Sequence, residues 1–320
     1  MKVSSILITG CAGFIGSTLS KRLISQGYLV VGVDNLNTAY NPIYKKHNLQ
    51  TLHSFPQFHF YKTDILDKKA LIKISQRHKP EVIVHLAALT GIRSSLGKAS
   101  IYEKVNIEGT QNVFEVGLQS KSQLFIFSSS SSIYGNNNQT PFQELQTPDP
   151  RSPYAKTKIE AEKLLKKMSK KSKLRTTILR LFSVYGPHGR PDMAPYLFTE
   201  AAFSKKVITL FGNGTSARDY TYIDDVVSAF GKVIQNQISN ETINVGNSHP
   251  IPLSGLIRII ENETKRKILF AKKPFLAAEA RITYANIKHA KKVINWEPQV
   301  EFKEGMKRFI QWYRFSRWNL

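Results

Sequence analysis

A glycine-rich turn near the start of the chain constrains the fold more than any other feature of this sequence. Residues 3–9 form an apolar run typical of a buried strand, and the sequence GCAGFIG follows directly at residues 10–16. A helical pattern over residues 14–26 begins inside this turn. Glycines at this spacing allow a tight turn and let backbone N–H groups approach a pyrophosphate, which the positive end of a helix dipole stabilises. The turn therefore predicts the first strand and helix of a dinucleotide-binding sheet.

The same alternation of strand and helix continues through the first half of the chain. Further strands are predicted at residues 28–34, 58–62, 81–86, 123–127 and 176–181, and helices at residues 66–77, 101–119 and 151–171. A helix over 224–233 and a strand over 242–245 are expected to return to the same sheet. We expect an α/β fold: a Rossmann-type doubly wound parallel sheet with a smaller α/β substrate-binding cap. The predicted cofactor-binding domain spans residues 1–181 with 224–246, and the predicted cap spans 182–223 and 247–320.

An acidic residue after the second predicted strand indicates which dinucleotide is bound. Asp34 lies eighteen residues beyond Gly16, where a carboxylate accepts hydrogen bonds from the adenosine ribose and repels a 2′-phosphate. NAD is therefore favoured over NADP. His85, inside an apolar strand, is expected to be a core residue. The predicted cofactor-binding residues are Gly10, Gly13, Phe14, Ile15, Gly16, Asp34, Asn35, Asn37, Asp64, Ile65, Leu86, Ala87, Ala88, Asn106, Tyr154 and Lys158.

Candidate catalytic residues follow the fifth predicted strand. A serine run at residues 128–132 ends this strand, and Tyr154 and Lys158 stand four residues apart on a predicted helix, so they share one helix face. A lysine ammonium there can bind a cofactor ribose and favours the phenolate form of the tyrosine. Lowering the pKa of a phenol from about 10 toward neutrality corresponds to about 4 kcal/mol, which we expect the ammonium, a nicotinamide cation and desolvation to supply together. Tyr154 is then able to take a hydroxyl proton while hydride leaves the same carbon.

These features resemble the extended short-chain dehydrogenase/reductase superfamily, in particular its NAD-dependent nucleotide-sugar epimerases and dehydratases. The narrower segments DNLN at residues 34–37, GIRSSL at 91–96 and YGPHGRPDM at 185–193 are most similar to UDP-glucuronate 4-epimerases. The resemblance implies an isomerase that uses tightly bound NAD to convert UDP-glucuronate to UDP-galacturonate through a transient 4-keto sugar. One alternative is a UDP-glucose or UDP-N-acetylglucosamine 4-epimerase. A non-catalytic NAD-binding sensor or scaffold is another, which the presence of Ser130, Tyr154 and Lys158 disfavours.

Carried over by position, the resemblance implies that Ser130 is the catalytic hydroxyl, Tyr154 the base and Lys158 its partner. Dehydratases and decarboxylases of the superfamily have acidic residues in the serine run, where this chain has Ser131 and Ser132, so hydride should return to the sugar. The implied substrate-binding residues are Arg93, Ser130, Ser132, Ser183, Arg190 and Arg218, with Arg218 on the diphosphate and Arg190 paired with a sugar carboxylate. A loop arginine that caps carbonyl groups is the other interpretation of Arg190. The sequence AAEA at residues 277–280 departs from the superfamily pattern and leaves the uridine contacts open.

Composition adds a large positive charge. The chain has 46 Lys and Arg against 23 Asp and Glu, a formal net charge of +23. Such an excess fits nucleic acid, an anionic membrane or an acidic substrate, but no nucleic-acid-binding motif accompanies it. We expect a UDP-sugar as the partner, with no nucleic acid, no membrane span and no metal, and the resemblance implies a homodimer. The single Cys11 and the lack of a signal-peptide pattern favour the cytoplasm, and an epimerised uronate suits polysaccharide biosynthesis.

Overall fold

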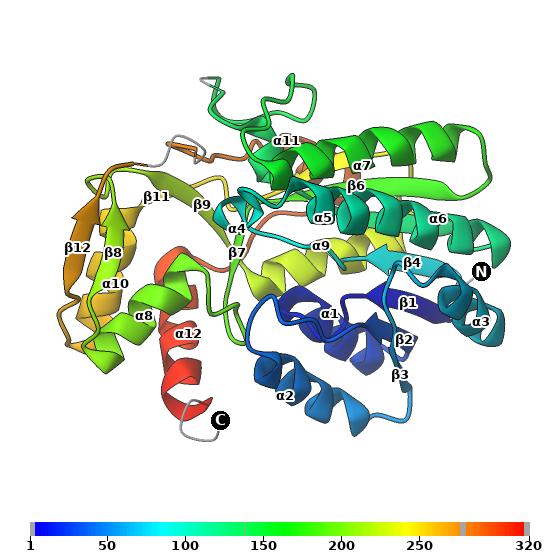
Figure 1. Ribbon diagram of the computed structural model, residues 1–320, viewed down its shortest axis with the longest axis horizontal. Coiled ribbons are helices and arrows are strands. Elements are labelled where there is room, and N and C mark those ends of the chain that lie inside the picture. The colour runs from blue at the N-terminus through cyan, green and yellow to red at the C-terminus, as the bar shows by residue number, and fades with distance from the viewer. Residues whose placement is uncertain (1–3, 138, 276–279, 317–320) are drawn as a thin grey trace.

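A seven-stranded parallel sheet lies at the centre of the molecule, in the strand order β10-β6-β5-β4-β1-β2-β3 (Figure 1). The computed structural model describes residues 4–137, 139–275 and 280–316. The strands of this sheet are β1 (Ser5–Thr9), β2 (Leu29–Asp34), β3 (Phe58–Lys62), β4 (Val82–His85), β5 (Leu124–Ser130), β6 (Arg175–Leu181) and β10 (Thr242–Val245). The strand order reverses between β1 and β4, which is the switch point where doubly wound sheets bind ligands. The predicted Rossmann-type sheet is confirmed.

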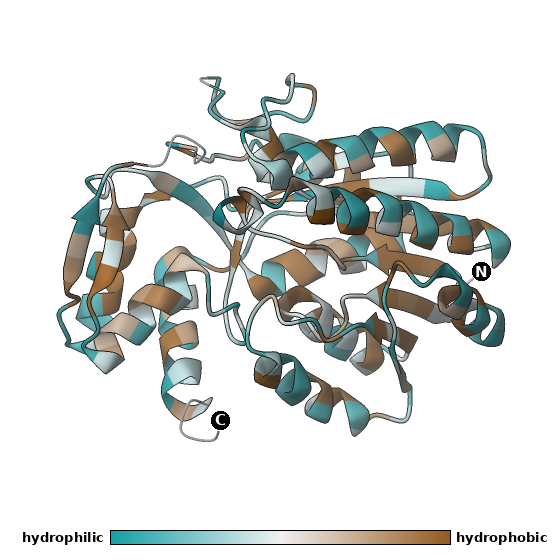
Figure 2. Ribbon diagram, in the orientation of Figure 1, coloured by the Kyte–Doolittle hydropathy of each residue, from teal (hydrophilic) through white to brown (hydrophobic). Residues whose placement is uncertain are grey.

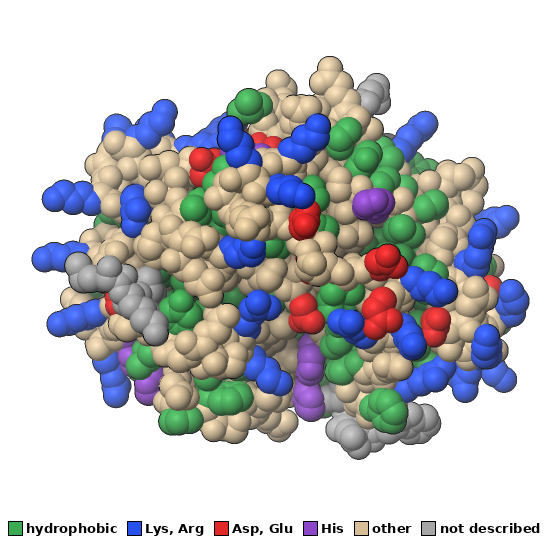
Figure 3. Space-filling model, turned by 180° about the vertical axis from the view of Figure 1, so that it is seen from behind, with side chains coloured by type: hydrophobic (Ala, Val, Ile, Leu, Met, Phe, Trp, Pro, Cys, Tyr) green, Lys and Arg blue, Asp and Glu red, His purple; other side chains and the backbone are tan. Residues whose placement is uncertain are grey.

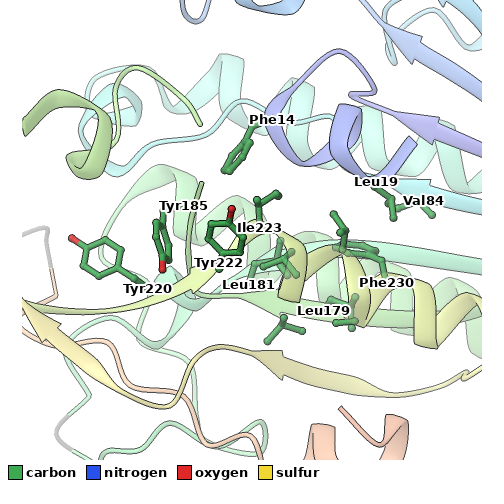
Figure 4. Packing of buried hydrophobic residues seen from close by; sticks show 14 of the residues in the cluster. Phe14, Leu19, Val84, Leu179, Leu181, Tyr185, Tyr220, Tyr222, Ile223 and Phe230 are labelled. Atoms are coloured by element: carbon green, nitrogen blue, oxygen red, sulfur yellow. The ribbon is translucent and has the colours of Figure 1, made fainter. Parts of the chain in front are cut away.

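Helices cover both faces of this sheet. One face carries α1 (Phe14–Ser25), α2 (Pro42–His53) and α9 (Ile223–Gln235), and the other carries α3 (Lys68–His78), α6 (Gly109–Gln119) and α7 (Pro153–Lys170). Because strand side chains alternate, Ile6 and Ile8 of β1 pack on the first face and Leu7 on the second. Strands β1 and β2 are hydrophobic along most of their length (Figure 2). Leu19, Val84 and Phe230 pack together between α1, the sheet and α9 (Figure 4). Two apolar layers therefore hold the sheet rigidly in place.

A second region stands at one end of the sheet (Figure 1). It contains a three-stranded sheet in the order β11-β9-β7 and a parallel pair of β8 with β12. Its elements are β7 (Ser183–Tyr185), α8 (Ala194–Ser204), β8 (Ile208–Phe211), β9 (Ala217–Tyr222), β11 (Pro250–Pro252), α10 (Leu253–Thr264), β12 (Phe270–Lys273) and α12 (Phe302–Ser316). Helix α11 (Lys288–Ile294) lies against β10 and α9. The predicted division into two domains at the stated boundaries stays a prediction.

Several elements differ from the sequence-based expectation. The helix predicted over 101–119 is three pieces: α5 (Ala99–Glu103), a π-helical turn η1 (Lys104–Glu108) and α6. Sequence analysis missed the short helix α4 (Ile92–Ser95), the 3-10 turn η2 (Ser131–Tyr134) and α2. Helix α2 has only a weak apolar stripe, but its start carried a signal: the Asn41 side chain accepts from the Ile43 N–H at 3.1 Å, and Pro42 occupies the first helical position.

Within residues 4–316 as described, no helix combines the length and apolarity that crossing a membrane requires. The same part of the chain brings together no group of three His, Cys, Asp or Glu side chains able to hold a metal ion. Lys and Arg side chains are spread over the face shown in Figure 3, with Asp and Glu fewer among them. On this face, the positive charge is therefore a general property of the surface.

Candidate active site

A cavity of about 880 Å³ lies at the carboxyl ends of the central strands, between the sheet and the second region. The glycine turn after β1, the end of β2, the segment after β4 and the serine run all line it. Residues of β7, α8 and β9 form the opposite wall. Ligands of doubly wound sheets bind at these strand ends, because the crossovers leave a crevice there.

The glycine turn is built for close approach of a ligand to the backbone. Gly10 has φ +73°, and a Cβ there would stand 2.9 Å from the Ala87 nitrogen. A Cβ on Gly16 would stand 2.1 Å from the Gly10 carbonyl oxygen. No side chain caps the start of α1 at Gly13, so the first N–H groups of this helix are left for an anion. The residues present therefore fit a dinucleotide pyrophosphate.

Asp34 ends β2 beside this turn and is 6% exposed. Its carboxylate accepts from the Leu36 N–H at 2.8 Å and from the Ala12 N–H at 3.2 Å. The Lys45 ammonium of α2 lies 3.4 Å away and also donates to the Asn37 side chain at 3.0 Å. Sequence reasoning missed Lys45 because it lies on the unpredicted helix. The carboxylate is thereby fixed in place at the cavity wall.

Two of the predicted cofactor residues, Asp64 and Asn106, are not among the described residues that line the cavity. Asp64 accepts a hydrogen bond from the Asn35 side chain at 2.7 Å. Asn106, in the π-helical turn, pairs with the Leu89 N–H at 2.8 Å and the Leu89 carbonyl at 2.9 Å, and it donates to Thr157 at 3.0 Å. Both side chains therefore support the cavity wall from behind. The other predicted cofactor residues line the cavity.

Ser130, Tyr154 and Lys158 all line the cavity, and the Tyr154 hydroxyl is hydrogen-bonded to Ser130. Helix α7 begins here because Ser152 caps it, accepting from the Ala155 N–H at 3.2 Å, and because Pro153 follows. Burial raises the pKa of the Tyr154 phenol, whereas a hydrogen bond with Ser130 and the charge of Arg190 lower it. The net direction is upward, so desolvation, which was expected to help lower the pKa together with the ammonium and a nicotinamide cation, raises it. The Lys158 ammonium donates a hydrogen bond to the Ser128 carbonyl at 2.7 Å.

Lys158 is itself strongly perturbed. It is 4% exposed and lies 4.6 Å from the centre of the Phe127 ring. Burial lowers the pKa of its ammonium to about 7, although the charge of Glu162, one helical turn further on, raises it. A buried amine with a pKa near neutrality can hold or release a proton at the pH where the molecule works. This pattern is typical of a catalytic lysine.

A buried charged network lies directly behind the serine run. Glu162 accepts from Ser129 Oγ at 2.5 Å and from Arg180 Nη2 at 2.8 Å. Arg180 also donates to the Tyr134 hydroxyl at 2.9 Å, which in turn donates to Asn244 at 2.7 Å. The Arg180–Glu162 pair is almost fully buried, with side-chain exposures of 4% and 1%. Sequence reasoning missed this network, which ties α7, β5, β6 and β10 together behind the catalytic residues.

The predicted substrate-binding residues Arg93, Ser132, Ser183, Arg190 and Arg218 all line the cavity. The Ser132 hydroxyl is buried and, within the described part of the chain, has no hydrogen-bond partner. The Arg93 guanidinium lies 4.1 Å from the centre of the Phe211 ring. Arg218 donates to the Ala217 carbonyl at 2.9 Å. Residues 277–279 of the unusual AAEA segment lie outside the described residues.

Arg190 already has an anionic partner. Its Nε donates to Asp192 Oδ1 at 3.0 Å, and its Nη2 donates to Asp192 Oδ2. A third nitrogen, Nη1, bonds Thr90 across the cavity. The predicted two-bond pairing with a sugar carboxylate therefore competes with an internal carboxylate. Asp192 and Thr90 were missed, although the RPDM sequence places an acid two residues after Arg190.

His85 is a core residue, as predicted. It is 1% exposed, and its ring nitrogens lie 2.7 Å from Thr9 Oγ1 and 3.0 Å from Thr110 Oγ1. Burial lowers the pKa of its ring to about 3, with a smaller contribution from Lys158. The imidazole is therefore neutral and satisfied at physiological pH.

Comparison with known proteins gives a consistent result over almost the whole chain. Residues 6–246 match the model of the NAD dependent epimerase/dehydratase family. A UDP-glucuronate 4-epimerase of Thermodesulfobacterium geofontis is 38% identical over 308 residues, covering 96% of this chain and 95% of that protein. The solved UDP-glucuronic acid 4-epimerase of Bacillus cereus, in complex with UDP-glucuronic acid and NAD, superimposes with a TM-score of 0.92 at 33% identity, covering 97% and 99% of the two chains. The UDP-glucose 4-epimerase of Thermotoga maritima, solved with UDP-glucose, gives a TM-score of 0.91 at 31% identity, covering 98% and 99%.

Proposed function

Because the chain belongs to the NAD-dependent epimerase/dehydratase family, we propose that it is a 4-epimerase that converts UDP-glucuronate to UDP-galacturonate with bound NAD. The relatives described above that carry the name UDP-glucuronate 4-epimerase support this substrate. The glycine turn and Asp34 fit the two ends of the adenosine diphosphate half of the cofactor.

One observation carries the reaction type: the serine run offers hydroxyls, and no acid, to the reacting carbon. Among the described residues that line the cavity, the carboxylates are Asp34 and Asp192. Asp34 is bound at the glycine turn and Asp192 is bound to Arg190. Neither is placed to remove a proton from the sugar ring for an elimination. The proton acceptor left beside Ser130 is therefore Tyr154, which suits oxidation and reduction at a single carbon.

The residues of the chain divide the proton chemistry among them. When bound, NAD would supply the acceptor for a hydride from C4 of the sugar, and that hydride would return to the opposite face of the same carbon. Tyr154 takes the proton of the 4-hydroxyl as hydride leaves and gives it back to the 4-keto oxygen after the sugar has turned. Ser130 is hydrogen-bonded to the Tyr154 hydroxyl. Its own hydroxyl would also bond and orient the oxygen on C4 of the sugar. Lys158 supplies a positive charge one helical turn away, which favours the phenolate once the proton moves.

The sugar carboxylate needs a donor, because the 4-keto uronate is a β-keto acid that loses CO₂ readily. The unpartnered Ser132 hydroxyl lies in the cavity wall two residues beyond Ser130 and can donate to that carboxylate. Ser183 lies in the opposite wall. Arg190 contributes charge from the cavity wall, but two of its nitrogens are bound to Asp192. We therefore assign the carboxylate first to Ser132 and only then to Arg190.

The test is turnover by the purified chain without added NAD, followed by proton NMR of the sugar. UDP-glucuronate, UDP-galactose and UDP-N-acetylglucosamine are supplied in separate reactions. We expect conversion of UDP-glucuronate, and none with the matched variant Tyr154→Phe. Preferential conversion of a neutral sugar would favour the second candidate, a UDP-glucose-type epimerase, which the Thermotoga maritima likeness supports. Turnover of none of the three sugars by wild type, with Tyr154→Phe indistinguishable from it, would exclude an epimerase.

The assembly and location of the enzyme are also proposals. We propose a homodimer, as the family resemblance implies, and a place in the cytoplasm, which suits a lone buried thiol at Cys11. Light scattering coupled to size-exclusion chromatography measures the first. Fractionation of cells that express the chain measures the second.

A further inference from the structure

We propose that a second cavity, at the β10 edge of the central sheet, binds a phosphorylated small molecule. The cavity has a volume of about 910 Å³. It is lined by the last turns of α7, the first residues of β6 and β10, residues 143–145, and residues 286, 288 and 289. The described residues that line it are all different from those that line the active-site cavity. We call it the edge groove.

The edge groove exists because of the strand order. Strand β10 is the outermost strand, and it pairs with β6. Helix α7 packs on β6 and β5, which are one and two strands in from the edge. A furrow is therefore left beside α7, with Thr176 and Ile178 of β6 and Thr242 of β10 in its wall.

Positive groups from separate elements gather in the edge groove. Lys166 and Lys170 stand one turn apart on α7, and Lys288 is the first residue of α11. Within the described part of the chain these three ammonium groups have no carboxylate within ion-pair distance. A helix dipole explains lysines at the end of α7, but it disfavours a cation at the start of α11. The dipole alone therefore does not account for this cluster.

The acids of the edge groove are already occupied. Glu241 bonds the His289 ring nitrogen Nε2 at 2.8 Å. Glu144 accepts from the backbone N–H of Asn244 at 2.9 Å. Within the described part of the chain, the lysines that line the groove are therefore not paired with these carboxylates, and an anion from solution can supply their counter-charge.

A buried hydroxyl in the wall of the groove supports the same conclusion. Thr176 is 5% exposed, lines the groove, and its hydroxyl has no hydrogen-bond partner among the described residues. The neighbouring Thr177, on the opposite face of β6, donates to the Ile238 carbonyl at 2.7 Å. Burying a hydroxyl without a partner is costly, so such groups in native proteins call for an acceptor. An oxygen of a bound phosphate would accept from Thr176.

The size of the groove and its chemistry define the ligand class. A volume of this order suits a small organic molecule. Ammonium donors and a hydroxyl donor suit a phosphate, which offers several acceptor oxygens and more than one negative charge.

The test is calorimetric titration of the purified full chain with inorganic pyrophosphate, at constant ionic strength set with NaCl. The groove variant is Lys166→Ala with Lys170→Ala. Its matched control is Lys167→Ala with Lys173→Ala, which removes the same charge from exposed residues that do not line the groove. We expect the groove variant to bind pyrophosphate at least about tenfold more weakly, since hydrogen bonds to charged groups are lost, and the control to stay within twofold of wild type. Any binding in the active site is common to all the variants.

A second variant, Thr176→Val, keeps the side-chain volume and removes only the hydroxyl. We expect it to weaken pyrophosphate binding while the melting temperature without pyrophosphate stays the same or rises, because an unpaired buried group is removed. A lower melting temperature would show that the hydroxyl already has a structural partner and would overturn the argument from Thr176. Equal titrations of wild type and the Lys166/Lys170 variant, including no binding by either, would overturn the site.

Discussion

Arg190 and Asp192 form a paired fork on one short loop, with Nε and Nη2 of the guanidinium bonded to the two carboxylate oxygens, inside the wall of the active-site cavity. The pairing satisfies the cation before any substrate arrives. An anionic sugar that contacts Arg190 would therefore have to compete with Asp192, and we propose that this competition affects selectivity between charged and neutral sugars.

The first prediction concerns Asp192→Asn. Removing the internal carboxylate leaves Arg190 to pair with the sugar carboxylate, so we expect the KM for UDP-glucuronate to fall roughly fivefold, equivalent to about 1 kcal/mol. The KM for UDP-galactose, which has no carboxylate, should change less than twofold. Steady-state kinetics with each sugar measure the two KM values. An equal change in both KM values would contradict a role in selectivity.

The second prediction concerns Ser132→Ala. Because the hydroxyl has no partner within the described structure, its removal should not lower the melting temperature. We expect kcat/KM for UDP-glucuronate to fall about tenfold, since a hydrogen bond to a charged group is lost. NMR of the products should also show more UDP-pentose from decarboxylation. Unchanged turnover and products would show that the carboxylate lies elsewhere.

The third prediction concerns Lys158 and pH. Burial lowers the pKa of Lys158 to about 7, below its unfolded value of about 10.4. Between these values the unfolded chain binds more protons, so this residue adds stability as pH rises and removes it as pH falls toward 7. The wild type minus Lys158→Met difference in free energy of unfolding should therefore rise by about 2 kcal/mol between pH 7 and pH 9. Urea unfolding at these two pH values measures it, and a flat difference would contradict the lowered pKa.

The fourth prediction concerns Glu162→Gln. The substitution leaves the Arg180 charge buried without its counter-charge, so we expect a loss of roughly 3–5 kcal/mol in the free energy of unfolding. The matched control is Glu160→Gln, which breaks the exposed pair with Lys163 and should cost less than about 1 kcal/mol. Urea unfolding of both variants gives the comparison. Equal losses would mean that burial of the Arg180 pair has no energetic consequence.

The fifth prediction concerns Gly16→Ala. A Cβ at this position would stand 2.1 Å from the Gly10 carbonyl oxygen, so the turn must open. We expect the purified variant to carry little or no NAD, measured by chromatography of the cofactor released on denaturation. The control is Gly231→Ala in α9, where an added Cβ meets no atom within 4 Å and should stabilise the helix by roughly 1 kcal/mol. Full NAD content in Gly16→Ala would contradict the assigned role of the turn.

Features that depend on local spacing could be predicted from the sequence. The glycine turn, Asp34 and the Tyr154–Lys158 pair each follow from residues close together in the chain, and the structure places all of them at one cavity. The central sheet could be predicted for a similar reason, because buried parallel strands appear in a sequence as near-continuous apolar runs.

Features that depend on contacts between distant segments could not be predicted. Thr90 and Arg190 bond across a hundred residues, and Lys45 reaches Asp34 from a helix whose weak apolar stripe gave no signal. The expected effect of desolvation on Tyr154 was also wrong, because burial, which the sequence does not reveal, raises the pKa of the phenol.

The late return of the chain to the central sheet has a consequence for biosynthesis. Strand β10 pairs with β6 in a register that joins Ile243 to Leu179, and Arg180 reaches Asn244 through Tyr134. A nascent chain that has only reached β6 therefore presents an unpaired strand edge, a template for association with other chains. Ribosomes must add a further 64 residues, from Leu181 to Val245, before that edge can close. Conditions that slow translation in this interval should increase aggregation of the nascent chain.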